Sequence, residues 1–196
     1  VSVMHAFWLS LAVVFVAELG DKSQLMALAF ATRYRTLPVL IGITAATALV
    51  HLFSVFIGDV LGSAIPEKPI AIVAAISFVF FGLWTLRGDE LSAGDKERAA
   101  IPAKHVIIAV GTVFFLSELG DKTMLATITL ATRHGIWGTW LGSTVGMVAA
   151  DALAIIIGRA LGARLPEKAI RISAAVLFFI FGALLLIDAL KLEHFY

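Results

Sequence analysis

The sequence predicts an all-α membrane protein with six transmembrane helices, arranged as two inverted three-helix repeats. Three observations support this fold class: an apolar composition, six long apolar segments, and a duplication at constant spacing. The 196-residue chain is 60% hydrophobic and 15% charged, with a mean hydropathy of +0.99. Soluble domains contain about 45–50% apolar and about 25% charged residues. The composition therefore indicates an integral membrane protein that sits in the lipid bilayer.

Charge and cysteine content exclude several other classes. The net charge of +1 leaves no basic surface, so we expect no nucleic-acid partner. The chain contains no cysteine, which excludes disulfide frameworks and thiolate metal sites. The first apolar segment is far longer than the hydrophobic region of a signal peptide and lacks a basic segment before it. We therefore expect this segment to be a membrane span and not a cleavable signal.

A helix needs about 20 apolar residues, within a range of about 17–25, to cross the hydrocarbon core of a bilayer. The predicted spans are Ala6–Thr32, Leu37–Leu61, Pro69–Leu86, Lys104–Thr132, Ile136–Leu161 and Lys168–Leu190. Between the third and fourth spans lies a polar stretch with glycine, proline and dense charge. We therefore expect a first repeat at residues 1–87, a cytoplasmic linker at 88–103 and a second repeat at 104–196, which together form one integrated transmembrane domain.

The second half of the chain repeats the first at a constant offset of 100 residues, without a gap. Roughly thirty of the 96 aligned positions are identical, and the segment 31–33, Ala-Thr-Arg, returns at 131–133. An odd number of spans per repeat means that the second copy enters the membrane from the opposite side. Inverted repeats of this kind place transport sites near the middle of the membrane, where the two repeats meet.

The distribution of basic residues predicts the orientation, because cytoplasmic loops are enriched in Lys and Arg. Thirteen Lys and Arg residues remain when Lys22 and Lys122 are set aside. With the N-terminus outside, ten of them are cytoplasmic and three are external. Equivalent loops also differ in charge as inversion requires, since Asp59 in the first copy becomes Arg159 in the second. We therefore expect both termini to be periplasmic or extracellular.

One hydrophilic hexapeptide occurs twice inside apolar segments, as ELGDKS at 18–23 and ELGDKT at 118–123. A charged residue at membrane depth costs about 2.5–3.5 kcal/mol on insertion scales, so such residues are seldom kept without a function. The acids of each motif are three residues apart and share a helix face. Carboxylate oxygens suit hard divalent cations such as Mg²⁺, Ca²⁺ and Mn²⁺. The predicted metal and transport site comprises Glu18, Asp21, Glu118 and Asp121.

Other polar residues are candidates for supporting roles. Gly20 and Gly120 lie between the acids, where a helix can break and expose backbone carbonyls. Possible auxiliary ligands or proton-handling groups are Ser23, Thr123, Gln24, Asp151 and His51, the last two at equivalent positions in mid-span.

Lys22 and Lys122 are better explained as charge-balancing partners than as participants in transport. Structural salt bridges alone remain an alternative, but five acids outnumber these two lysines. The three excess negative charges would be relieved by a cation or by protons, which suggests coupling between the two.

The duplicated pattern E-x-G-D-[KR]-[ST] resembles the family of Golgi, chloroplast and bacterial manganese/calcium transporters, and both copies match at every defined position. The resemblance covers essentially the whole chain. It implies Mn²⁺ or Ca²⁺ exchange driven by protons, with the functional acids at Glu18, Asp21, Glu118 and Asp121. The absence of a long N-terminal extension and of a long acidic central loop makes the chain similar to compact bacterial members. This implies Mn²⁺ efflux across the inner (plasma) membrane by a multi-pass protein.

Three hypotheses follow. The first is a secondary transporter that exports Mn²⁺ in exchange for H⁺ by alternating access, with Ca²⁺ as the alternative substrate. The second is a divalent cation channel that uses the same acids as a filter. The third, an intramembrane metal-dependent hydrolase, lacks a nucleophile and base in the sequence, so we expect no enzymatic activity. Under the first hypothesis the chain needs no cofactor besides the transported ions, and its oligomeric state stays open, with a homodimer as one option.

Overall fold

The computed structural model describes residues 2–88, 93–94, 97, 105–161 and 167–191 of the chain. This part of the chain contains eight helices and no strand, which confirms the all-α prediction. The first four helices are α1 (Val3–Glu18), α2 (Lys22–Arg33), α3 (Thr36–Ala64) and α4 (Glu67–Arg87). The second half contributes α6 (Val106–Glu118), α7 (Lys122–His134), α8 (Ile136–Leu161) and α9 (Glu167–Lys191). The predicted linker lies mostly outside the described residues.

Within the described part of the chain, four helices are long and apolar enough to cross a membrane: α3, α4, α8 and α9. A fifth span results if α1 and α2 are counted together, although they are bent by 76° at their junction. The predicted span Lys104–Thr132 corresponds to two short helices, α6 and α7, of 13 residues each. It is divided because the second motif interrupts the helix. The structure therefore has four to five candidate spans, and six spans in two inverted repeats remain a prediction.

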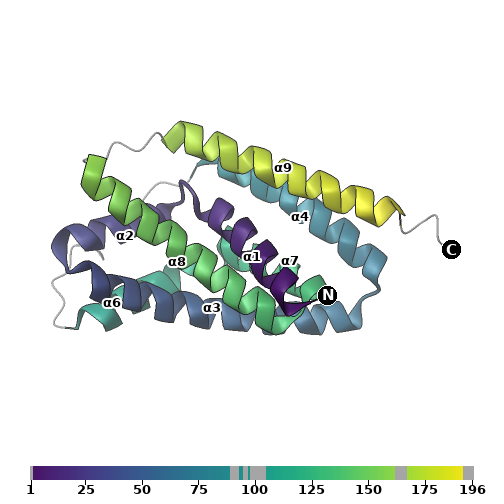
Figure 1. Ribbon diagram of the computed structural model, residues 1–196, viewed down its shortest axis with the longest axis horizontal. Helices are drawn as coiled ribbons and strands as arrows, with labels where there is room; N and C mark the ends of the chain where they lie inside the picture. The colour runs from purple at the N-terminus through teal and green to yellow at the C-terminus, as the bar shows by residue number, and fades with distance from the viewer. Residues whose placement is uncertain (1, 89–92, 95–96, 98–104, 162–166, 192–196) are drawn as a thin grey trace.

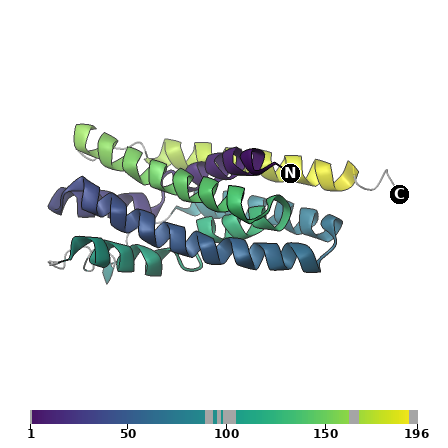
Figure 2. The same ribbon diagram turned by 60° about the horizontal axis from the view of Figure 1, so that its bottom comes forward.

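Helices from the two halves of the chain interlock. α1 lies along α8, while α6 and α7 lie along α3. The last helices of the two halves, α4 and α9, run side by side along one edge of the molecule (Figure 1). The turned view in Figure 2 shows α3 between α8 and α6, in agreement with its contacts to both. Each half therefore buries its first helices against the long second helix of the other half, and the two halves form one unit.

Glycines let these helices approach closely, because small residues bring helix backbones together in a membrane. A Cβ atom on Gly42 of α3 would lie 2.8 Å from the carbonyl oxygen of Ile107 in α6. At the position 100 residues later, a Cβ atom on Gly142 of α8 would overlap the carbonyl oxygen of Phe7 in α1. The two contacts join equivalent residues, so the duplicated sequence produces the same helix packing twice.

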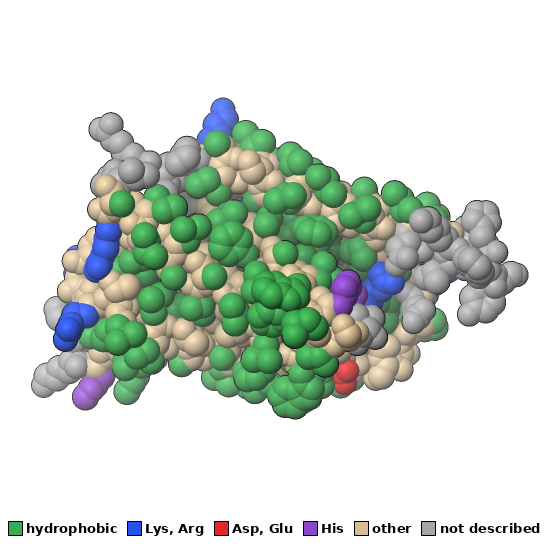
Figure 3. All heavy atoms as spheres, viewed as in Figure 1, with side chains coloured by type: hydrophobic (Ala, Val, Ile, Leu, Met, Phe, Trp, Pro, Cys, Tyr) green, Lys and Arg blue, Asp and Glu red, His purple; other side chains and the backbone are tan. Residues whose placement is uncertain are grey.

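The core consists of two apolar clusters, and each combines residues from both halves. One cluster contains Met26, Ala27, Phe30, Ala31, Val39, Ile43, Ala46, Val110, Phe114 and Ile155. The other contains Val13, Ala17, Phe78, Phe81, Ala126, Leu130 and Phe178. On the face shown in Figure 3, apolar side chains cover most of the described surface, and the few Lys and Arg side chains lie towards its margins. α1 begins and α9 ends at the same end of the molecule (Figure 1).

Candidate cation site

Both hexapeptide motifs lie where a helix breaks. α1 ends at Glu18 and α2 begins at Lys22, and the same interruption separates Glu118 from Lys122. The residue in the middle of each break is glycine with a positive φ, 75° at Gly20 and 78° at Gly120. This left-handed conformation strains residues that carry a Cβ atom. The glycines therefore allow one helix to end and the next to begin after only three intervening residues.

Asp21 caps the helix that follows the first break. It is the N-cap of α2, where its Oδ2 accepts hydrogen bonds from the Ser23 backbone N–H at 3.3 Å and from the Ser23 hydroxyl at 2.9 Å. Asp121 occupies the equivalent position before α7. A carboxylate at this position is stabilised by the unpaired N–H groups and by the positive end of the helix dipole. Asp21 is therefore held in place by its own half-helix, whereas the Asp121 side chain makes no capping hydrogen bond to α7.

The motif lysines pair across the two halves of the chain. The Nζ atom of Lys122 contacts Oδ1 of Asp21, and both side chains are buried, with 2% and 0% of their surface exposed. The Nζ atom of Lys22 lies 3.4 Å from Oδ1 of Asp121, and 26% of the Lys22 side chain is exposed. The lysine of each break therefore balances the aspartate of the other break. These two ion pairs hold the breaks side by side in the middle of the molecule.

The motif glutamates are fully buried and only partly satisfied. The Ser23 hydroxyl contacts Oε1 of Glu18, and the Thr123 hydroxyl donates to Oε2 of Glu118 at 3.0 Å. The second oxygen of each glutamate, Oε2 of Glu18 and Oε1 of Glu118, has no hydrogen-bond partner among the described residues. A buried carboxylate oxygen needs a partner, because its desolvation is costly. A cation, a water molecule or a proton can supply it.

Asp151 of α8 joins the same group of acids. Its side chain is fully buried, and neither carboxylate oxygen has a hydrogen-bond partner within the described part of the chain. It interacts electrostatically with both Glu18 and Glu118. Three buried carboxylates, two from the motifs and one from α8, therefore interact electrostatically at the junction of the two halves.

Gln24 connects the first break to the helix that carries this third acid. Its Oε1 accepts the Gly20 backbone N–H at 2.8 Å, and its Nε2 donates to the carbonyl oxygen of Ala150 at 2.9 Å. The amide oxygen that could have served as a cation ligand is therefore used to hold the broken backbone. His51, the residue equivalent to Asp151, is also buried, but it is not among the electrostatic neighbours of the two motif glutamates. Neither of its ring nitrogens has a described hydrogen-bond partner.

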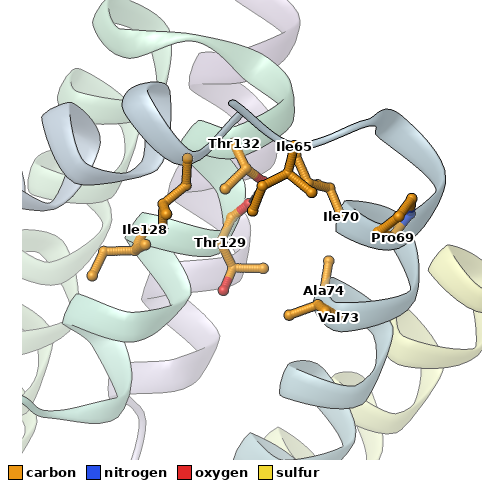
Figure 4. Close-up of a pocket in the computed structure, with 9 residues that line it drawn as sticks. Ile65, Pro69, Ile70, Val73, Ala74, Ile128, Thr129 and Thr132 are labelled. Atoms are coloured by element: carbon orange, nitrogen blue, oxygen red, sulfur yellow. Dashed lines mark hydrogen bonds between the residues drawn. The ribbon is translucent and has the colours of Figure 1, made fainter. Parts of the chain in front are cut away.

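The carboxylates do not form a complete coordination shell. No group of three or more His, Asp or Glu side chains in the described residues is close enough to hold a metal ion together. Asp21 and Asp121 are paired with the lysines, whereas Glu18, Glu118 and Asp151 each keep at least one carboxylate oxygen without a described hydrogen-bond partner. A pocket of about 140 Å³ at the outer ends of α3, α4 and α7 offers no alternative site, because apolar side chains form most of its lining (Figure 4).

The chain matches the profile of a family described as divalent cation/proton antiporter GDT1 twice, at residues 6–93 and 106–193. The chain belongs to the GDT1 family. Members of this family are transporters and not enzymes, which confirms the resemblance and the absence of enzymatic activity that the sequence predicts. The two matches coincide with the two halves of the chain, so each half carries the family pattern.

Several curated proteins are similar to this GDT1-family chain. A protein of Vibrio cholerae with the provisional name of manganese exporter is 31% identical over 179 residues, which cover 90% of this chain and 88% of that protein. The GDT1-like protein sll0615 of Synechocystis is 27% identical, over 91% of this chain and 95% of the relative. GDT1-like protein 4 of Arabidopsis thaliana is 28% identical, over 92% and 95% respectively. No solved structure is significantly similar to the chain.

Two residues of this GDT1-family protein contact the breaks, although the sequence did not single them out for that role. Met124 accepts the Gly120 backbone N–H with its sulfur at 3.2 Å, in the place that Gln24 takes at the first break. Arg171 of α9 covers the first break, since a Cβ atom on Gly20 would lie 3.1 Å from its Cγ. The role of Met124 could have been inferred from the sequence, because the offset of 100 residues makes Met124 equivalent to Gln24.

The two breaks differ in how they are covered. Gly20 lies under the first turns of α9, where Ile170 and Arg171 are its neighbours. A Cβ atom on Gly120 would meet nothing within 4 Å among the described residues, and the preceding Leu119 is 46% exposed. The two halves are therefore equivalent in sequence but adopt different positions relative to the pair α4 and α9.

Proposed function

We propose that this GDT1-family protein is a secondary transporter that exports Mn²⁺ in exchange for protons by alternating access. The observation that carries the proposal is the set of buried carboxylate oxygens without a hydrogen-bond partner among the described residues, on Glu18, Glu118 and Asp151, at the junction of the two breaks. The family supplies the reaction type, and the name of the Vibrio cholerae relative suggests the metal. We further propose six spans in two inverted repeats in the inner membrane, with both termini outside.

In this proposal the free oxygens of Glu18, Glu118 and Asp151 are the first ligands of the cation. Asp21 and Asp121 complete the site when their lysines move away, and the hydroxyls of Ser23 and Thr123 orient the glutamates. All of these donors are oxygens, which suit Mn²⁺ and Ca²⁺. We assign no resident cofactor, because the ions that bind here are the transported ones. His51 is a candidate proton-handling group, since its buried ring has no described partner.

Charge explains why cation and proton would exclude each other. Five acids and two lysines at the junction leave three formal negative charges in a site shielded from water. One divalent cation offsets two of these charges, and so do two protons. The two also compete for the same carboxylate oxygens, because a carboxyl group must lose its proton to bind a metal ion. Binding of one therefore favours release of the other.

The unequal cover of the breaks supports alternating access. With the N-terminus outside, α9 starts at the cytoplasmic end, so Arg171 and Ile170 would close the first break from the cytoplasm. Movement of the pair α4 and α9 relative to the breaks would uncover Gly20 and cover Gly120. Because the two repeats are equivalent, the opposite state uses the same contacts with the roles of the halves exchanged.

The decisive test is transport in proteoliposomes that contain the purified protein. We expect Mn²⁺ flux that is driven by a pH gradient and that moves protons in the opposite direction. Glu18→Gln and Glu118→Gln should each abolish this flux while the protein stays folded. Leu119→Ala, which alters the second break without removing a carboxylate, is the matched control. Full flux in both glutamine variants would refute the site, and flux at channel rates without proton movement would refute exchange.

Ca²⁺/H⁺ exchange is the second candidate, because an all-oxygen donor set also suits Ca²⁺. Binding of Mn²⁺, Ca²⁺ and Mg²⁺ to the purified protein at several pH values separates the two. Tighter binding of Mn²⁺ than of Ca²⁺, with competition by protons, supports manganese export. The reverse order would assign calcium as the substrate and leave the site unchanged.

A further inference from the structure

Two histidines from different halves of the chain meet far from the helix breaks. His5 is in the first turn of α1 and His134 is the last residue of α7. Their ring centres are 5.9 Å apart and their planes are tilted by 55°. Nδ1 of His134 is buried and has no hydrogen-bond partner in the described part of the chain, while His5 is exposed to the surroundings.

This separation suits a metal ion between the two rings. Bonds of about 2.0–2.1 Å from a zinc ion to one nitrogen of each imidazole place the ring centres roughly 5–6 Å apart. Imidazole is a good ligand for Zn²⁺, Cu²⁺ and Ni²⁺, and Mn²⁺ is the weakest binder in the divalent series. The geometry points to a two-histidine site at His5 and His134 that binds Zn²⁺, Ni²⁺ or Cu²⁺ in preference to Mn²⁺ or Ca²⁺.

The site is separate from the carboxylates and is present at one end of the molecule only. Twelve residues of α7 separate His134 from the break at Lys122, which corresponds to about 18 Å along a helix. At the equivalent positions of the other repeat the chain has Tyr34 and His105. A single imidazole there cannot form the same pair. The inverted repeat therefore has two metal-binding side chains at one end and one at the other.

A metal ion at this site would link α1 to α7. The two helices contact each other directly, belong to different halves and each border one of the breaks, so we propose in addition that alternating access requires them to move relative to each other. This second step rests on the proposed function, whereas metal binding itself does not. The positive charge of Arg133 lies beside His134 and weakens cation binding, so we expect the ion to be exchangeable. An occupied site should therefore inhibit transport reversibly.

Calorimetric titration of the purified full-length protein with Ni²⁺ tests the site directly. We expect one Ni²⁺ binding event to be lost in His5→Ala and in His134→Ala, and kept in the matched control His105→Ala. Because His5 is exposed, its replacement removes little packing, so a folded variant is available even if His134→Ala is unstable. Equal Ni²⁺ binding by wild type and His5→Ala would overturn the inference.

A flux measurement then tests whether metal binding at the two histidines inhibits transport. Ni²⁺ added to the side where α1 begins should inhibit Mn²⁺ flux by the wild type and by His105→Ala, but not by His5→Ala. Inhibition that persists unchanged in His5→Ala would overturn the link to transport. Absence of Mn²⁺ flux in the wild type would refute the proposed function instead, and the calorimetric result would still decide the metal site.

Discussion

Replacement of Lys122 by methionine should destabilise the protein far more than the same replacement of Lys22. Lys122 pairs with Asp21 at 2% and 0% exposure, so its removal leaves a buried carboxylate without its counter-charge. Loss of one partner of a buried pair costs about 3–5 kcal/mol. The pair of Lys22 with Asp121 is longer, at 3.4 Å, and 26% of the lysine is exposed. Solvent at Lys22 screens this pair, so the expected loss is smaller than for Lys122, although Asp121 itself is only 2% exposed.

The assay is reversible unfolding of the purified variants in mixed micelles, with the free energy of unfolding as the measured quantity. A third variant, Lys122→Met combined with Asp21→Asn, removes both charges and should recover most of the lost stability, because no isolated charge remains buried. Equal losses for Lys22→Met and Lys122→Met would refute the assignment of one buried and one screened pair. Failure of the double variant to recover would show that the destabilisation has another origin.

Three further predictions concern the breaks. Because the chain has no native cysteine, Leu119→Cys and Leu19→Cys can be compared directly. A water-soluble maleimide should label position 119 faster, because α9 covers the first break and nothing described covers the second. Equal or reversed labelling rates would contradict this difference between the breaks. Gly120→Ala should cost about 1–2 kcal/mol of unfolding free energy from backbone strain alone, since nothing described lies near its Cβ position, and a stability unchanged within error would argue against the left-handed turn. Thr123→Val removes the hydroxyl donor to the motif glutamate, so Mn²⁺ binding measured by calorimetry should weaken, whereas Thr129→Val, whose hydroxyl bonds only within α7, should bind as the wild type does.

The sequence predicted the helices of this protein well where apolar segments were continuous. The predicted spans Leu37–Leu61 and Ile136–Leu161 correspond to α3 and α8. Prediction was weaker at the motifs. The span Lys104–Thr132 divides into two short helices, because a glycine with positive φ ends one helix and an aspartate starts the next. Composition shows that such a segment is apolar enough for a membrane but does not reveal that its axis turns.

Polar residues of the motifs were identified from sequence, but their partners were not. The charge count suggested that lysines balance acids, and the structure pairs Lys122 with Asp21 and Lys22 with Asp121, each across the two halves. A pairing within one motif was equally compatible with the sequence. Gln24 was expected to be a possible cation ligand, and its side chain instead binds the Gly20 N–H and the Ala150 carbonyl. These outcomes depend on which helices are neighbours.

The sequence by itself determined that the chain is an apolar, duplicated, helical membrane protein with two acidic motifs placed at glycine breaks. These properties follow from the order of residues along the chain and do not depend on which helices are neighbours in space. Only the tertiary structure decided which charges neutralise one another, which carboxylate oxygens stay without a protein partner, and which break α9 covers. The physical reason is that two halves with equivalent sequences can pack in more than one relative position. Contacts between them, and not the properties of either half, select the arrangement.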